Sequence, residues 1–362
     1  MQTPKIMNAF FIISFLSGLL SSCESTIVEQ QYLPNTEGIK ANVELVRFDQ
    51  LFFKLDTAQL EPNLKKLKES YPDFTTGYLQ AFLNASVDNP MGLNRVQGFL
   101  RHPDTRYTYD TIQQVFDSLA PIKAQLNELA THYSYYFPEQ PPLDKAYTYL
   151  CDYHGDRLAV LESGFVGLPL DMALGQCYAP YTFLKIPQYD QRTCTKAHLV
   201  PKAADAVAQN LLMIYGASGG THLLDLMLYN GKVFYLSDIL LPTVADSLKF
   251  GFSSFQMAYM TKGELNLYEY LSNEELMYES ETKKINKFII KGPFKPHLDL
   301  PGNSGSWLGF RMVQSYVNAM RKEYKKTQPN ADARTIDIEI LQKVLKETDP
   351  QQFLMYYKPP KR

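Results

Sequence analysis

The fold is decided by residues 201–231, which read PKAADAVAQNLLMIYGASGGTHLLDLMLYNG. Apolar residues recur at helical spacing on both sides of a glycine-rich segment, and they are Ala204, Val207, Ala208, Leu211 and Leu212 before it and Leu223, Leu224, Met227 and Leu228 after it. We predict that Pro201 opens the first helix, that Thr221 caps the second, and that Asn230-Gly231 ends it in a left-handed turn. Two apolar helices joined by a glycine loop predict a buried hairpin.

The chain before this hairpin is predicted to be mainly helical. A helix is indicated by the spacing of Leu60, Leu64, Leu67 and Tyr71, and Pro72 stops it. A second helix is predicted to begin at Tyr78, and a third is predicted from the apolar repeat Ile112, Val115, Phe116, Leu119 and Ile122.

Short β-strands are predicted at three places in the same part of the chain. Residues 43–53 begin with apolar alternation, and residues 146–151 and 158–161 are rich in aromatic and aliphatic side chains. Gly164, Gly167 and Pro169 are typical of a loop. These segments predict a small central sheet.

The chain after the hairpin is predicted to be helical again. The pattern continues through residues 265–276, and a proline-rich loop follows at 293–301. Ser304 or Ser306 is predicted to cap a helix over 307–324, and a last helix is expected near 336–345. The predicted fold class is therefore α+β, predominantly α-helical with a small central β-sheet.

Composition excludes several classes of protein. The 362 residues hold 36 Lys+Arg against 38 Asp+Glu, a formal net charge of −2, so no basic field favours nucleic acid and none is expected as a partner. Four cysteines without a Cys-x-x-Cys pair are too few for a disulfide scaffold or a zinc ribbon.

The N-terminus has the layout of a bacterial lipoprotein signal. Lys5 precedes an apolar stretch that is shorter than the roughly 20 residues needed to span a bilayer, and this stretch ends in Leu20-Ser21-Ser22-Cys23. That ending resembles a lipobox, whose cysteine receives the lipid and becomes the first residue after cleavage. We therefore predict a signal peptide at 1–22, lipidation of Cys23, a tether at 23–40 and a single domain at 41–362. The alternatives are an ordinary signal peptide with a chance cysteine, or a buried helix.

Two short motifs suggest nucleophilic or metal chemistry, each with a structural alternative. Gly216-Ala217-Ser218-Gly219-Gly220 matches Gly-x-Ser-x-Gly, but a nucleophile elbow needs a preceding strand, and the preceding spacing here is helical. The favoured interpretation is an interhelical loop, with His222 nearby only in sequence. Residues 151–156 contain a cysteine, a histidine and two aspartates, and a buried thiol followed by turn residues explains them more simply.

Other candidate sites are weaker. No histidine has a second histidine four residues away, so the sequence lacks a His-Glu-x-x-His motif. The loop 301–306 precedes a helix and could bind an anion, but it lacks the lysine of a P-loop, and capping is the favoured role. If Cys23 is lipidated, one disulfide at most can form among the others, and Cys177 with Cys194 is the favoured pair.

Several segments together carry a resemblance to a known family. They are Val46-Arg47-Phe48-Asp49, Tyr71-Pro72-Asp73-Phe74, Tyr136-Phe137-Pro138, Gly164 to Asp171 with Leu174-Gly175, His222 to Tyr235 with Leu241-Pro242, Trp307 to Tyr316, and Tyr357-Lys358-Pro359. With these segments the chain resembles the gliding motility lipoprotein GldB family over roughly residues 40–360. The resemblance implies a lipid-anchored envelope protein of the gliding machinery, linked to the secretion of surface adhesins, and it carries over no catalytic residue.

A second likeness concerns the hairpin. A helix, a loop and a second helix with Leu-Leu-Asp look like the later half of gluzincin metallopeptidases. In that comparison Asn230 occupies the place of a zinc-binding glutamate, and residues 203–207 stand where paired histidines would be. This likeness implies a zincin-like fold without its metal.

Two functional hypotheses follow. The first is a non-catalytic lipoprotein without a cofactor, anchored at Cys23, facing the periplasm from either the inner or the outer membrane, and binding other gliding and secretion proteins. The second is an envelope hydrolase, either a serine enzyme using Ser218 or an atypical metallopeptidase.

Overall fold

The computed structural model describes residues 32–154, 160–161, 164–293 and 300–361. The signal peptide and Cys23 lie outside the described residues, as does the tether up to residue 31. Leu33 and the residues after it belong to one compact unit. Within the described residues, no helix is both long and apolar enough to cross a membrane.

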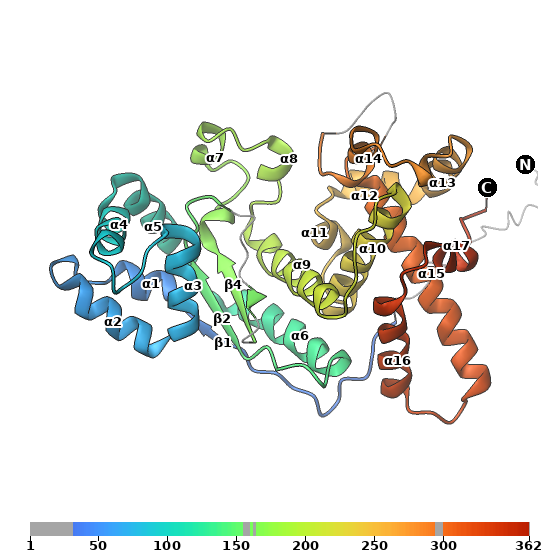
Figure 1. The fold of residues 1–362 in the computed structure, drawn as a ribbon, viewed down its shortest axis with the longest axis horizontal. Coiled ribbons are helices and arrows are strands. Elements are labelled where there is room, and N and C mark those ends of the chain that lie inside the picture. The colour runs from blue at the N-terminus through green and yellow to red at the C-terminus, as the bar shows by residue number, and fades with distance from the viewer. Residues whose placement is uncertain (1–31, 155–159, 162–163, 294–299, 362) are drawn as a thin grey trace, which may run out of the picture. The chain divides into compact units, whose positions relative to one another are not determined.

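A small sheet lies between two groups of helices (Figure 1). Its strands are β1 Glu44–Val46, β2 Lys145–Tyr149, β3 Val160–Leu161 and β4 Phe165–Pro169, in the spatial order β1-β2-β4-β3. β2 pairs in parallel with both β1 and β4, with Lys145 opposite Glu44 and Phe165, whereas β3 is antiparallel to β4. Nearly every residue of β2 and β4 is buried, as expected for parallel strands covered on both faces. The loop predicted at 164–169 is therefore wrong, because burial on both faces suits a strand there despite Gly167 and Pro169.

Six helices form the N-terminal part. They are α1 Phe48–Phe53, α2 Leu60–Ser70, α3 Pro72–Leu83, α4 Pro90–Arg101, α5 Pro103–Val115 and α6 Ala120–Tyr136, with a 3₁₀ turn at Thr57–Gln59. Pro72 both follows the end of α2 and occupies the first position of α3, where a missing N–H costs nothing. The single helix predicted over 112–122 is wrong, because the chain breaks between α5 and α6, where Pro121 lies in the first turn.

The N-terminal helices pack on the sheet through aromatic rings. Phe74 of α3 stacks on Tyr147 of β2 with ring centroids 4.2 Å apart, and Phe48 meets Phe74 edge to face at 4.8 Å. Arg47 makes a bidentate ion pair with the buried Asp49, which also accepts a 2.5 Å hydrogen bond from the Thr148 hydroxyl. The predicted strand at 43–53 is thus β1 followed by α1.

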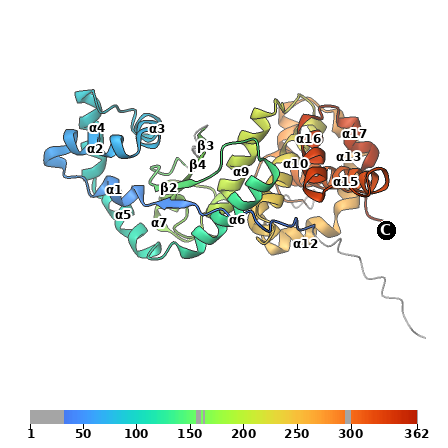
Figure 2. The same ribbon diagram turned by 90° about the horizontal axis from the view of Figure 1, so that it is seen from below.

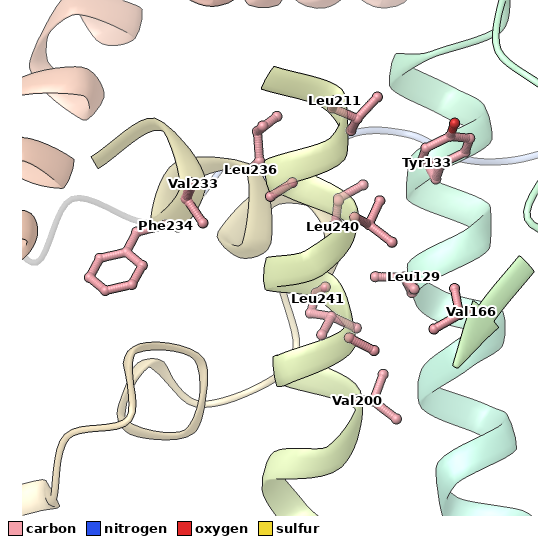
Figure 3. Close-up of a cluster of buried hydrophobic side chains, with 14 of the residues drawn as sticks. Leu129, Tyr133, Val166, Val200, Leu211, Val233, Phe234, Leu236, Leu240 and Leu241 are labelled. Atoms are coloured by element: carbon pink, nitrogen blue, oxygen red, sulfur yellow. The ribbon is translucent and has the colours of Figure 1, made fainter. Parts of the chain in front are cut away.

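The predicted helical hairpin is confirmed as the centre of the fold. Two short helices, α7 Ala179–Phe183 and α8 Gln188–Gln191, precede α9 Lys196–Ile214 and α10 Leu223–Leu240. Figures 1 and 2 show α6 and α9 between the sheet and α10, and Figure 3 shows the apolar side chains that join them. This cluster includes Leu129 and Tyr133 of α6, Val166 of β4, Val200 and Leu211 of α9, and Leu236 and Leu240 of α10.

The predicted boundaries of the hairpin are wrong in three places. α9 starts at Lys196, so Pro201 lies inside it, and the residue that caps α10 is His222 rather than Thr221. α10 also continues through Asn230-Gly231 for more than two further turns. Gly231 packs against the backbone of Gly309, and a Cβ atom at Gly231 would lie 2.3 Å from the Gly309 carbonyl carbon. Glycine is required there for close helix approach and not for a left-handed turn.

The described residues of the C-terminal part form mainly helices, as predicted. Its helices are α11 Asp246–Phe250, α12 Ser254–Lys262, α13 Glu264–Asn273, α14 Thr282–Ile289, α15 Ser304–Thr327, α16 Ala333–Lys346 and α17 Pro350–Tyr356, with a 3₁₀ turn at Leu276–Tyr278. The helix expected at 336–345 is α16, and α17 follows it. The long helix α15 lies along α10, and α16 and α17 pack on α15. The predicted fold class, α+β with mostly helix and a small sheet, is confirmed.

Candidate functional site

The glycine-rich segment 216–220 forms the loop between α9 and α10, as predicted. Gly216 and Gly220 have φ angles of +73° and +63°, which other residues rarely adopt. The element before the loop is a helix, so the strand-turn-helix geometry of a nucleophile elbow is not formed.

His222 and Asp225 are engaged in capping α10. The Asp225 carboxylate accepts hydrogen bonds from the backbone N–H groups of Thr221 (3.2 Å) and His222 (3.0 Å), and it lies 3.2 Å from His222 Nδ1. Ser218 is exposed and makes no hydrogen bond with His222 within the described part of the chain. These residues therefore do not assemble a Ser-His-Asp triad here.

Ser218 instead lies at a cavity of about 190 Å³ beside α10. The cavity is lined by Ala217, Ser218, Gly220, Asp225, Leu228, Tyr229, Lys232, Glu347, Thr348, Pro350 and Phe353. Its lining comes from three places: the glycine loop, one face of α10 at three- and four-residue spacing, and the turn between α16 and α17 together with α17 itself.

Lys232 is the chemically distinctive residue of this cavity. The residue is 6% exposed, its Nζ donates a 2.6 Å hydrogen bond to the Glu347 carbonyl oxygen, and Nζ lies 5.2 Å from the centre of the Phe353 ring. Burial lowers the pKa of Lys232 to about 8, although the negative charge of Glu347 opposes that shift. A substantial fraction of the amine is therefore neutral near physiological pH.

A second polar cluster lies on α9. His198, Lys202 and Asp205 share one helix face and are partly buried. Burial lowers the pKa of His198 to about 4, an effect reinforced by the Lys202 charge, and it lowers the pKa of Lys202 as well. Burial raises the pKa of Asp205 to about 6, while a 2.5 Å hydrogen bond donated by the Ser237 hydroxyl opposes that change. This network joins α9 to α10.

The gluzincin likeness falls on these two helices. Asp205, in the segment 203–207, bonds Ser237, and the Asn230 amide donates a 2.9 Å hydrogen bond to the Ser306 hydroxyl of α15. Over the residues that the structure describes, no group of three or more His, Cys, Asp or Glu side chains is arranged to hold a metal ion. The zincin-like interpretation stays a prediction.

The Cys151 segment forms a tight turn around a buried carboxylate. Asp171, just after β4, accepts hydrogen bonds from the backbone N–H groups of Cys151 (3.0 Å) and Tyr153 (2.9 Å), and from the Cys151 thiol at 3.3 Å. Burial raises the pKa of both Asp171 and Cys151, which leaves the thiol protonated and unreactive. Within 151–154 the cysteine is therefore structural, as favoured from the sequence, and residues 155–156 lie outside the described residues.

The predicted Cys177–Cys194 disulfide is wrong. Both residues and Cys151 carry free thiols. Cys194 is buried, with its thiol 3.4 Å from the Asp190 carbonyl oxygen, whereas Cys177 is exposed.

The loop before α15 is packed rather than open. A Cβ atom at Gly302 would lie 2.4 Å from the Gly292 nitrogen, so the loop already contacts neighbouring backbone. The predicted serine cap is also wrong, since α15 begins at Ser304 after Asn303, and no side chain caps it. Among the residues that the structure describes, the buried Ser304 hydroxyl has no hydrogen-bond partner, and the Ser306 hydroxyl accepts from the Asn230 amide.

A comparison with known protein families covers the part of the chain that contains all of these residues. The family model described as Gliding motility protein GldB matches residues 29–359 of the chain. The chain belongs to this family. No curated protein and no solved structure matches it. The cavity, the α9 cluster and the sheet all lie within the range matched to the GldB family, which is a component of gliding motility and not a known enzyme family.

The sequence analysis did not predict the buried amine of Lys232 in this GldB family member. Lys232 was read as following a helix end, and Glu347 and Phe353 approach it only through the packing of distant helices. A lysine in the middle of a strongly apolar helix was the available signal, because lysine is rarely buried without a specific role.

Proposed function

We propose that this GldB family member is an envelope lipoprotein anchored through Cys23, and that it acts by binding other proteins of the gliding machinery. The observation that carries the proposal is the family match over residues 29–359, joined to the lipobox-like Leu20-Ser21-Ser22-Cys23 that precedes it. A lipid anchor agrees with the lack of a spanning helix in the described residues. Several acyl chains on one cysteine make a stable anchor, since each buried CH₂ contributes about 0.8 kcal/mol.

Binding is favoured over catalysis by what the surface offers. Phe183 is 86% exposed, Phe255 69% and Met213 67%, and these large apolar side chains are the contact points that we propose for partners. The histidine and aspartate beside Ser218 cap a helix, so they are not free for acid-base work. The link to adhesin secretion rests on the family resemblance.

The anchor is tested by replacing Cys23 with alanine in a strain that lacks the native copy. We expect Cys23→Ala protein to leave the membrane fraction and the cells to stop gliding. Cys177→Ala is the matched control, because that thiol is free and exposed, and it should leave both properties unchanged. Normal gliding by a strain whose Cys23→Ala protein is present in normal amounts would overturn the proposal.

The binding role is tested by crosslinking in living cells. A photoreactive residue at Phe183 should yield discrete adducts with envelope proteins, whereas the same residue at the exposed Lys322 serves as the surface control. Adducts that need gliding-competent cells would support the proposal. Identical adducts from both positions would show that the Phe183 surface has no specific partner.

The second candidate, a hydrolase using Ser218, is favoured only by the position of that hydroxyl at a cavity that also contains Lys232. Ser218→Ala complementation and metal analysis of the purified chain separate the two. Full motility with Ser218→Ala and no bound zinc would leave the binding role alone.

A further inference from the structure

We propose that Lys232 is a reactive amine, which forms a reversible imine with a small aldehyde or ketone that enters the cavity beside α10. The site consists of the lysine side chain at the cavity wall, a fixed backbone acceptor for one of its N–H bonds, and hydroxyl-bearing residues in the lining. This inference is independent of the binding role proposed above.

The hydrogen bond to Glu347 orients the amine for attack. A neutral amine has two N–H bonds and one lone pair, and a carbonyl oxygen accepts only from an N–H. Because the Glu347 carbonyl oxygen lies 2.6 Å from Nζ, it holds one N–H bond. The lone pair must therefore point elsewhere, and Lys232 is one of the residues that line the cavity. The Phe353 ring, 5.2 Å away, supports the side chain from α17.

Burial favours the neutral amine, whereas the negative charge of Glu347 opposes it. Lys232 is almost fully buried, and its polar partner is a carbonyl rather than a carboxylate. The charged groups around the cavity are Asp225 on the same helix, whose carboxylate is engaged at the helix start, and Glu347 on the facing turn. With a pKa of about 8, about a quarter of the amine is neutral at pH 7.5, against about one in a thousand for an ordinary lysine.

The proposed step needs no oxidant or reductant. The Nζ lone pair attacks the carbonyl carbon and forms a C–N bond, while the C=O π electrons move to oxygen, which takes up a proton. Nζ loses one proton, which balances the proton that the oxygen took up. A second proton from solvent reaches the hydroxyl group, and water leaves as the C=N bond forms, so the first product is the protonated imine, which gives the imine when it loses that proton to solvent. Glu347 also lines the cavity and provides a carboxylate for these transfers. Hydrolysis reverses the sequence.

The lining indicates the class of carbonyl compound. A volume of about 190 Å³ admits a small molecule, and Ser218, Thr348 and Tyr229 contribute hydroxyl groups. Hydroxyl groups pair well with hydroxyl groups, because each both donates and accepts. A short hydroxyaldehyde or hydroxyketone is therefore the preferred ligand, and glycolaldehyde is the probe.

The experiment treats the purified full-length chain with glycolaldehyde and sodium cyanoborohydride, which reduces the imine to a stable amine. Mass spectrometry of peptides then measures the modification rate of each lysine between pH 6.5 and 9. We expect Lys232 to react at least tenfold faster than the exposed Lys262 at pH 7.5, with a rate that levels off above about pH 8. Equal rates for Lys232 and Lys262 would overturn the proposal.

Two comparisons separate the effect of the cavity on the reaction rate from the effect of burial on the lysine pKa. Lys202 also has a lowered pKa but is not among the residues that line this cavity, so it should react slowly. Ala217→Trp adds bulk to the cavity lining at a residue other than Lys232, and it should slow Lys232 by tenfold or more while circular dichroism shows a native fold. If Lys202 reacts as fast as Lys232, or if Ala217→Trp changes nothing, then the cavity has no part in the reaction and the proposal fails.

Discussion

Gly231→Ala should destabilise the protein strongly, because α10 and α15 touch backbone to backbone at this residue. An added Cβ atom would lie 2.3 Å from the Gly309 carbonyl carbon and 2.5 Å from the Phe310 nitrogen, whereas ordinary contact begins at 3.4 Å. The obstacle is helical backbone, which cannot rotate aside as a side chain can. The helices would have to separate locally by 3.4 minus 2.3, or about 1.1 Å.

The expected loss of unfolding free energy is at least about 3 kcal/mol. Overpacking in a core usually costs about 1–3 kcal/mol, and here the strain falls on backbone atoms of the most extensive helix pair in the fold. A gap of 0.5–1 Å already removes roughly a quarter to a half of the dispersion energy between facing atoms. Gly309→Ala should cost still more, because its Cβ atom would lie 1.9 Å from the Met227 carbonyl oxygen.

Gly98→Ala is the matched control. Gly98 lies in the exposed part of α4, with no heavy atom within 4 Å of an added Cβ, so alanine there should raise stability by roughly 0.8–1.0 kcal/mol through helix propensity alone. Urea unfolding of the full-length chain, followed by circular dichroism, measures all three variants. A Gly231→Ala midpoint equal to that of wild type, with Gly98→Ala shifted upward, would refute the backbone contact.

Four further variants test the polar groups by urea unfolding. Asp205→Asn should gain up to about 3 kcal/mol of unfolding free energy relative to wild type between pH 4 and 7. The pKa of Asp205 is raised from 3.8 to about 6, so the wild-type protein loses stability as pH rises through that range, and a difference that does not change with pH would contradict the prediction. Lys232→Met should lose about 3 kcal/mol of unfolding free energy relative to wild type between pH 7.5 and 10.5. The pKa of Lys232 is lowered from 10.5 to about 8, so the wild-type protein gains stability as pH rises through that range, and an unchanged difference would show an ordinary pKa. Ser304→Ala should stabilise by about 1 kcal/mol, because the buried Ser304 hydroxyl has no hydrogen-bond partner among the described residues. Ser306→Ala should destabilise, because it removes the acceptor for the Asn230 amide, and the reverse order would show that Ser304 has a partner.

Helical periodicity predicted the hairpin because the pattern is local. The apolar residues of α9 and α10 recur at helical spacing within short stretches of sequence, and both helices bury them as expected. The end of α10 was mispredicted for the opposite reason. Asn-Gly is a common helix terminator. The sequence around Gly231 does not show that the backbone of Gly309, on another helix, packs directly against it. Tertiary contact overrode a correct local propensity.

The candidate site was likewise predicted only where its residues are consecutive in the sequence. The glycine loop with Ser218 was found from its motif, since loop residues are consecutive. Lys232 was not found, because its pKa depends on burial and its partners come from a turn more than a hundred residues later. The Cys177–Cys194 pair failed for a related reason: counting cysteines limits the number of disulfides but says nothing of which thiol packs inside.

The helix crossing and the cavity have a common physical origin. Gly231 precedes Lys232 directly, so the residue that lets α15 approach α10 also fixes where the amine lies. Helix α15 in turn carries α17, since Tyr316 of α15 packs on Phe353 with ring centroids 4.8 Å apart, and Phe353 is the ring against Lys232. A helix pair held apart by a larger residue at 231 would withdraw Phe353 and the Glu347 carbonyl from the amine and let water reach it. The pKa of Lys232 should then return toward that of an ordinary lysine, so the amine chemistry depends on the same glycine contact as the stability of the fold.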